Sequence, residues 1–149
     1  MWFEIDDIRN VATPALVFYR KRIEDNIQKM VEIAGNPVRL APHIKTHKCP
    51  NIVRMQQDRG INRFKCATIA EADMLGECKA GEVILAYQPV GPAIHRFMEL
   101  QQVYPETDFS CLCDNPEVIR EIDRASQEAN LISSLYIDLD CGHHRTGIA

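Results

Sequence analysis

Short apolar runs that alternate with amphipathic segments constrain the fold of this chain more than any other feature. Six runs have the apolar, β-branched and aromatic composition of strands, at residues 13–19, 38–44, 64–69, 83–88, 109–113 and 135–139. Between them, apolar residues recur with a helical period at residues 20–34, 50–57, 70–79, 93–104 and 115–129. A strand and a helix together repeat roughly every 20 to 25 residues, which predicts an α/β fold with a parallel sheet.

Two parallel architectures fit this alternation, an open doubly wound sheet and a (β/α)8 barrel. A dinucleotide-binding doubly wound domain carries G-x-G-x-x-G after its first strand, and this chain has no such motif there. A complete barrel needs eight units and about 250 residues, whereas the chain has 149. It stops directly after a predicted strand, which would leave an apolar face and an open edge. We therefore expect part of a longer protein, with residues 1–12 as an irregular or edge segment ahead of the body.

Charge and cysteine spacing narrow the function classes. A net charge of −4 argues against nucleic acid or an anionic membrane surface as partner. No apolar run approaches the roughly 20 residues that span a bilayer, and the N-terminus is acidic where a signal peptide is basic. The six cysteines include no C-x-x-C pair, so we interpret them as reduced thiols in a cytoplasmic protein.

The segment with the most unusual chemistry is the basic turn that follows residues 38–44. Lys45 lies between His43 and His47, with Lys48 close by. Neighbouring cations disfavour the ammonium form of a lysine, so we expect Lys45 to supply a neutral amine that attacks a carbonyl group. The alternative interpretation is a solvated basic turn with no chemical role.

Further polar residues follow the other predicted strands. In a parallel fold the carboxyl ends of the strands meet at one rim, where catalytic groups gather. The candidates at this rim are Thr68, Glu71, Tyr87, Gln88, Asp114, Asp138, Asp140 and Arg145. Each has a structural alternative, since aspartates cap loops and a glutamine can simply end a strand. His143 and His144 are adjacent and point in different directions, which makes them a poor metal site.

Five motifs in order make the chain resemble a known family. They are Thr13-Pro-Ala-Leu-Val17, Pro42-His-Ile-Lys-Thr-His-Lys-Cys49, Ala67-Thr-Ile-Ala-Glu-Ala72, Leu85-Ala-Tyr-Gln88 and Ile137-Asp-Leu-Asp-Cys-Gly-His-His-Arg-Thr-Gly147. Together they resemble the N-terminal part of the fold-type III pyridoxal-phosphate enzymes, which are relatives of alanine racemase. The likeness is greatest to the D-threonine aldolase and D-serine dehydratase branch, and it covers nearly the whole chain from residue 13.

The resemblance implies a fold and a set of site residues. Residues 13–149 would form the N-terminal portion of a (β/α)8 barrel, supplying its first five or six strand–helix units, and the family's C-terminal β domain lies outside this chain. Lys45 would carry pyridoxal 5′-phosphate as a Schiff base, and Arg145 would lie at the cofactor's rim. The other implied cofactor-binding residues are His43, Thr68, Gln88, Asp138 and Asp140.

Two departures from the family pattern point away from a simple alanine racemase. Asp138 stands where alanine racemase has a lysine, and residues 46–50 lack the tyrosine that follows the cofactor lysine there. The resemblance therefore implies a metal-activated, D-threonine aldolase-like lyase that cleaves D-β-hydroxy amino acids. The alternatives are a D-serine dehydratase, an amino-acid racemase and a non-enzymatic pyridoxal-phosphate homeostasis protein. It also implies a divalent metal, Zn or Mn, whose ligands lie outside this chain, and a homodimer as the full-length form.

Overall fold

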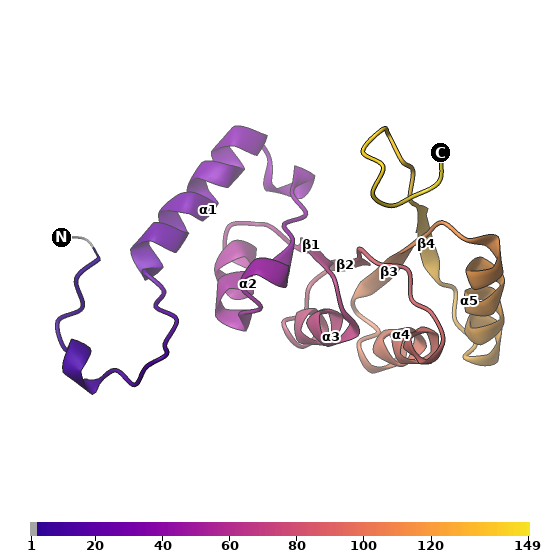
Figure 1. Ribbon diagram of the computed structural model, residues 1–149, viewed down its shortest axis with the longest axis horizontal. Coiled ribbons are helices and arrows are strands. Elements are labelled where there is room, and N and C mark those ends of the chain that lie inside the picture. The colour runs from indigo at the N-terminus through magenta and orange to yellow at the C-terminus, as the bar shows by residue number, and fades with distance from the viewer. Residues whose placement is uncertain (1–2) are drawn as a thin grey trace.

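A four-stranded parallel sheet forms the centre of the computed structural model, which describes residues 3–149 (Figure 1). The strands are β1 (Arg63–Cys66), β2 (Glu82–Leu85), β3 (Asp108–Cys113) and β4 (Ser134–Ile137). Each strand pairs with the next in chain order, so the sheet grows in one direction only. This order is that of a barrel wall, whereas a doubly wound sheet reverses direction at a switch point.

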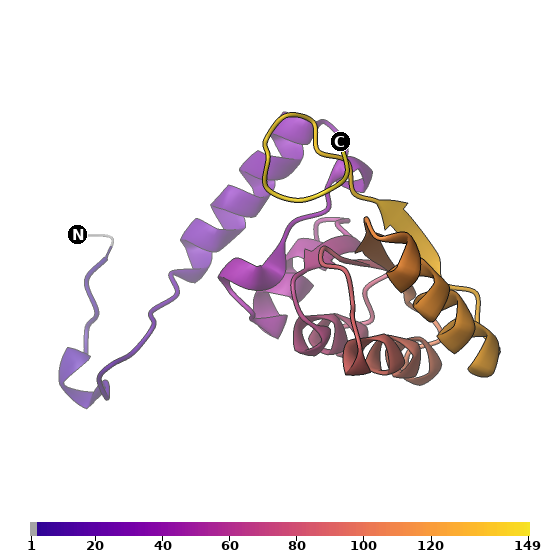
Figure 2. The ribbon, with the colours of Figure 1, turned by 45° about the vertical axis from the view of Figure 1, so that its right-hand side comes forward.

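Residues 3–149 contain five α-helices, of which the last three connect successive strands. They are α1 (Arg20–Ala34), α2 (Pro50–Gln57), α3 (Ile69–Glu77), α4 (Pro92–Val103) and α5 (Pro116–Glu128). Figures 1 and 2 both show α3, α4 and α5 on the same side of the sheet. Helices on one face are expected of a barrel, since a doubly wound sheet carries them on both. The predicted α/β fold and its partial-barrel form are confirmed.

Local sequence explains where the helices begin and end. Proline occupies the first helical position of α2, α4 and α5, where its missing N–H costs nothing. The Asn115 side chain caps α5 by accepting a hydrogen bond from the Glu117 N–H at 2.8 Å. Gly35 ends α1 with a φ of 74°, a left-handed conformation that favours glycine. All five predicted helices lie within two residues of these bounds.

The first two predicted strands are wrong. Residues 13–19 form no strand in the described chain, and Leu16 and Phe18 are exposed there. Residues 38–44 are interrupted by a 3-10 turn, η2 (Pro37–Arg39), and contribute only a single parallel bridge from His43 to Lys65. The Asn36 side chain accepts from the Val38 N–H at 3.0 Å and holds this turn. Apolar composition makes a strand only where a sheet edge is available to pair with it.

The core lies between the sheet and the helices. Phe64, Val83 and Cys111 point to the helices and are fully buried against residues such as Phe97. Because side chains alternate along a strand, the residues between them face the opposite side of the sheet. That opposite face carries Arg63, Lys65, Glu82 and Tyr136 together with the apolar Ile84 and Leu112, so the charged residues of these strands lie on the side away from the helices. Among residues 3–149, no helix is long and apolar enough to cross a membrane.

Candidate active site

A cavity of about 500 Å³ opens at the carboxyl ends of the strands, and we call it the lysine cavity. Its polar lining comes from η3 (Ile44–Thr46) and its cap, from β1, and from the segments after β2, β3 and β4. These polar residues are His43, Lys45, Lys65, Tyr87, Gln88, Asp114, Asp138, Arg145 and Thr146. Five of the seven predicted site residues therefore meet in one cavity: His43, Lys45, Gln88, Asp138 and Arg145. Thr68 and Asp140 do not line it.

The turn that carries Lys45 is fixed by its neighbours. Ile44 is fully buried and anchors η3 in the core. His43 Nδ1 accepts a hydrogen bond from the Lys45 N–H at 3.3 Å, and His47 Nδ1 accepts one from the Cys49 N–H at 3.1 Å. Burial lowers the pKa of both histidines, and for His43 the nearby Lys45 and Lys65 lower it further. Both rings therefore act as neutral acceptors that shape the turn.

Lys48 ties this turn to the first turn of α3. Its Nζ forms an ion pair with the carboxylate of Glu71, which is 4% exposed. The other Glu71 oxygen accepts the Ala67 N–H at 2.7 Å. Burial acts to raise the pKa of Glu71, but the hydrogen bonds from Lys48 and Ala67 outweigh it, so that the pKa lies below the ordinary value. Two motifs that are distant in the sequence are thus joined beside Lys45.

The side chain of Lys45 itself has no partner among the described residues. Within the described residues, its side chain forms neither a hydrogen bond nor an ion pair, although His43, His47 and Lys48 around it all have partners. The structure therefore fixes the backbone of Lys45 through its neighbours, and the exposed Lys45 residue lines the lysine cavity. That arrangement suits a nucleophile better than a solvated basic turn, in which the neighbouring side chains would have no fixed partners.

The remaining predicted site residues organise the loops around the cavity. Gln88 Oε1 accepts the N–H groups of Asp114 at 2.9 Å and Asn115 at 3.1 Å, and so links the segments after β2 and β3. Thr68 Oγ1 accepts the Glu71 N–H at 3.1 Å and caps α3. Gln88 thus both lines the cavity and supports it, whereas Thr68 acts from outside.

Asp140 organises the loop that carries Arg145. Its Oδ1 accepts the N–H groups of Gly142 and His144, both at 2.9 Å, and its Oδ2 lies 3.1 Å from His144 Nδ1. The hydrogen bond from the His144 N–H is the main cause of a lowered pKa at Asp140. Gly147 closes the same loop with a φ of 93°, and a Cβ there would lie 2.7 Å from the Leu139 carbonyl carbon. The spacing of this motif therefore reflects loop geometry as well as chemistry.

Lys65 is the ionisable residue that the sequence interpretation missed. It lies on β1 between the buried Phe64 and Cys66, and its side chain lines the lysine cavity. The signal that could have found it is the alternation along β1, which turns every second side chain away from the helices. A charged residue between two buried apolar ones on a strand has to face another charge, water or a ligand.

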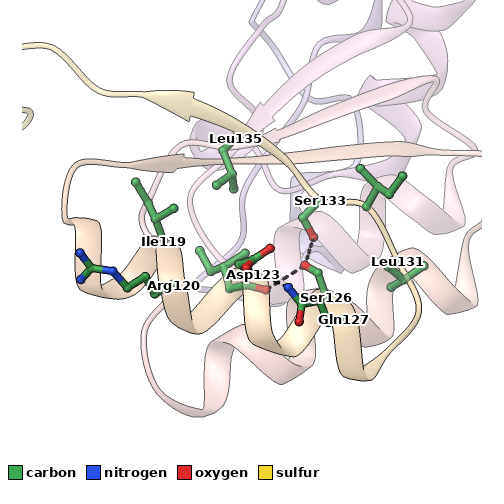
Figure 3. Close-up of a pocket in the computed structure, with 10 residues that line it drawn as sticks. Ile119, Arg120, Asp123, Ser126, Gln127, Leu131, Ser133 and Leu135 are labelled. Carbon is green, nitrogen blue, oxygen red and sulfur yellow. Dashed lines mark hydrogen bonds between the residues drawn. The ribbon is translucent and has the colours of Figure 1, made fainter.

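A second cavity, of about 460 Å³, lies on the helix side of the sheet between α5 and β4 (Figure 3). We call it the serine cavity because the hydroxyl oxygens of Ser126 and Ser133 meet there, 2.8 Å apart. Ile119, Ile122 and Leu135 form much of its wall. No lysine or histidine lines it, and we therefore assign the chemistry to the lysine cavity.

The fold and the lysine cavity define a class, a β/α-barrel domain with a lysine-lined cavity at the carboxyl end of its sheet. The family model for the alanine racemase N-terminal domain matches residues 19–149. The chain therefore belongs to the alanine racemase N-terminal domain family.

Similar proteins narrow this assignment. The chain is 28% identical to a D-threonine aldolase from Arthrobacter over 97% of its length and to a D-serine dehydratase from Dictyostelium discoideum over 95%. Its fold matches the crystal structure of D-threonine aldolase from Filomicrobium marinum over 95% of the chain, with a TM-score of 0.85 and 26% identity. It also matches D-threo-3-hydroxyaspartate dehydratase from Delftia sp. HT23 over 94%, with a TM-score of 0.78 and 26% identity.

This chain spans only part of those proteins. It covers 38% of the length of both curated relatives, 38% of the aldolase structure and 37% of the dehydratase structure. Another structure of that dehydratase is a C353A mutant described as metal-free. Among residues 3–149, no group of three or more His, Cys, Asp or Glu side chains is placed to hold a metal ion.

Proposed function

We propose that the protein carrying this chain is a pyridoxal-phosphate-dependent lyase acting on D-β-hydroxy amino acids, with Lys45 as the residue that binds the cofactor. The observation that carries this proposal is that Lys45 lines the lysine cavity from a fixed turn, and that its side chain has no hydrogen bond or ion pair among residues 3–149. Family membership and the names of the relatives agree with it, since the aldolase and both dehydratases are named for such substrates.

The residues of the lysine cavity fit this cofactor. A volume of about 500 Å³ lies within the usual range for small-molecule sites. Lys45 would hold the cofactor by offering its amine to the cofactor's aldehyde group. Arg145 offers a guanidinium donor in the same cavity. When bound, pyridoxal phosphate takes up electron density from the Cα of an amino acid.

The chain's own side chains would position and transfer protons in this cavity. His43 accepts at Nδ1, so its neutral ring carries the proton at Nε2. Asp138 adds a carboxylate to the lining. Gln88 fixes the loop that holds Asp114 beside them. We assign His43 and Asp138 to proton handling and orientation, and Lys45 to holding the cofactor.

An aldolase breaks the Cα–Cβ bond of the substrate, whereas a dehydratase removes its β-hydroxyl group. Relatives with both names match this chain at the same identity of 28%, so the dehydratase is our second candidate. We further propose that the full-length protein is a cytoplasmic homodimer, with a divalent metal, Zn or Mn, bound by ligands outside this chain. In agreement with a reducing compartment, all six cysteines are free thiols.

Borohydride trapping tests this proposal. The full-length protein would be mixed with pyridoxal phosphate, its absorbance recorded, and the complex reduced, which fixes the cofactor to lysine as a secondary amine. We expect peptide mapping to place the label on Lys45 and Lys45→Ala to lose both the label and the absorbance change. Lys29→Ala, at an exposed lysine on α1, is the matched control and should keep both. Label retained in Lys45→Ala would show that another lysine binds the cofactor and would overturn the assignment.

A further inference from the structure

Lys65 is placed in the lysine cavity by the backbone of β1. Its N–H donates to the Pro42 carbonyl at 2.9 Å, and its Cα pairs with His43 in a parallel bridge. The side chain therefore starts from a rigid strand and enters the same cavity as His43 and Lys45. A group on a strand is held more precisely than one on a loop, which favours a specific binding role.

The contrast with Arg63 shows that Lys65 lacks a protein partner. Arg63 lies two residues earlier on the same face of β1, where its Nε is 2.8 Å from Glu82 Oε2 and its Nη2 donates to the Tyr136 hydroxyl at 3.1 Å. Within residues 3–149, the Lys65 ammonium has neither an ion pair nor a hydrogen bond. Lys65 is half-buried as a residue, and its side chain lines the cavity with no protein counter-charge, which leaves the ammonium available to a ligand or to water.

The charges that line the cavity favour an anionic ligand. Lys45, Lys65 and Arg145 supply cationic side chains, and Asp114 and Asp138 supply carboxylates. Neither carboxylate lies within ion-pair distance of a cation in the described chain. Lys45 is assigned to the cofactor's aldehyde, so Lys65 is the strand-borne cation that remains for another anionic group.

We propose that Lys65 binds an oxyanion of the ligand, namely the side-chain carboxylate of a D-3-hydroxy dicarboxylic amino acid. This inference rests on the proposed function and specifies its substrate. The similar proteins are named for D-threonine, D-serine and D-threo-3-hydroxyaspartate. Of these substrates, hydroxyaspartate alone brings a second carboxylate. A lysine ammonium on the cavity wall favours that substrate, because it can pair with the second carboxylate. It gains no such interaction from the methyl group of D-threonine or the hydrogen atom that D-serine has in its place. The cofactor's phosphate is the other oxyanion that Lys65 could bind.

Binding of amine-free analogues tests this proposal without relying on turnover. D-Malate resembles the dicarboxylic substrate, and (R)-2-hydroxybutyrate resembles the neutral one. Both would be titrated by calorimetry into the cofactor-saturated full-length protein. We expect Lys65→Met to lower the affinity for D-malate by about 10- to 100-fold and to change the affinity for (R)-2-hydroxybutyrate by no more than about twofold. A hydrogen bond to a charged group is lost only in the D-malate complex. Lys65→Arg should keep most of the affinity for D-malate, and the control Lys29→Met should change the affinity for neither analogue.

The other outcomes separate the possible oxyanions. If Lys65→Met leaves the ratio of the two affinities unchanged but weakens pyridoxal phosphate and inorganic phosphate, Lys65 serves the cofactor and the proposal is wrong. The proposal is also wrong if Lys65→Met lowers the affinities for both analogues equally, or lowers neither. Circular dichroism and thermal unfolding would check the fold of Lys65→Met, and Lys65→Gln is the second variant if that fold is lost. In activity assays, the ratio of kcat/KM for 3-hydroxy-D-aspartate to that for D-threonine should fall with the D-malate affinity.

Failure of the proposed function would be recognised separately. If Lys45 takes no borohydride label, the titrations would be run on the protein without cofactor. A Lys65-dependent preference for D-malate would then keep the dicarboxylate site while the lyase assignment is lost. Labelling of Lys45 without any such preference would keep the lyase and remove the dicarboxylate site.

Discussion

The two faces of the sheet do different work, although every strand contributes to both. The helix-covered face is apolar and closely packed, with Phe64, Val83 and Cys111 fully buried. The opposite face carries Arg63, Lys65 and Glu82 on the same strands. Each face has a cavity beside it, the serine cavity with its largely aliphatic wall and the lysine cavity with its charged one. Because alternate side chains point in opposite directions, one set of strand residues packs against the helices, and the other set places Lys65 in the lysine cavity.

We expect changes on the helix-covered face to lower stability, and a change at Lys65 on the opposite face to lower ligand affinity. Phe64→Ala should produce the largest effect, because it removes a fully buried ring from the middle of β1. We expect a loss of about 3–5 kcal/mol in the free energy of unfolding, measured by urea denaturation. Lys65→Met, at the next position, is the matched control and should stay within about 1 kcal/mol. Equal losses in both variants would contradict the division between the faces.

The loop at Gly147 tests how much of the site depends on backbone geometry. Gly147→Ala should cost about 1–3 kcal/mol, because φ is 93° and the new Cβ meets the backbone of residues 138–140. We also expect slower borohydride labelling of Lys45 with pyridoxal phosphate, because the loop carries Arg145 into the lysine cavity. Gly142→Ala is the control: its φ of 96° is equally unusual, but no atom lies within 4 Å of its added Cβ. A larger loss in Gly142→Ala would show that backbone strain, and not the close contact, dominates.

The Glu71 carboxylate joins the turn that carries Lys45 to the start of α3 and gives a pH-dependent test. Its folded pKa lies below the ordinary 4.5, so its stabilisation is fully present above that value and is lost as the pH falls through the lower folded pKa. We expect Glu71→Gln to cost about 1–2 kcal/mol near neutral pH, a modest figure because Lys48 is largely exposed. Chemical denaturation across the acid range should show that the difference in free energy of unfolding between the wild type and Glu71→Gln shrinks below pH 4.5. A gap that stays constant would mean that the carboxylate does not titrate as its contacts require.

The helices could be predicted from sequence because their signals are local. Apolar periodicity, proline at the first turn and a capping side chain such as Asn115 act within a few residues, and all five helices follow them. Strands depend on a partner that composition does not reveal. Residues 13–19 have strand-like composition and pair with nothing in the described sheet, and residues 38–44 contribute one bridge.

The candidate site could be predicted in part for the same physical reason. Strand ends meet at one rim in any parallel fold, so His43, Lys45, Gln88, Asp138 and Arg145 were placed together without knowledge of the tertiary structure. Lys65 was missed because it lies inside a strand, where its direction depends on which face the helices cover. The hydrogen bonds of Asp140 and the ion pair of Lys48 with Glu71 depend on loop conformations, which residue types alone do not determine.

Tyr136 gives the smallest effect and the finest test of the charged face. Its hydroxyl accepts from Arg63 at 3.1 Å and donates to Glu82 Oε1 at 3.2 Å, and so connects β4 to β1 and β2. Tyr136→Phe should cost at most about 0.5–1 kcal/mol, since the ring is 41% exposed and Arg63 keeps its ion pair with Glu82. Urea denaturation measures this loss, and D-malate affinity should not change, because Tyr136 does not line the lysine cavity. If D-malate affinity falls with Tyr136→Phe, the network of Arg63, Glu82 and Tyr136 is coupled to Lys65. Ligand binding would then depend on the other polar residues of the opposite face as well as on Lys65.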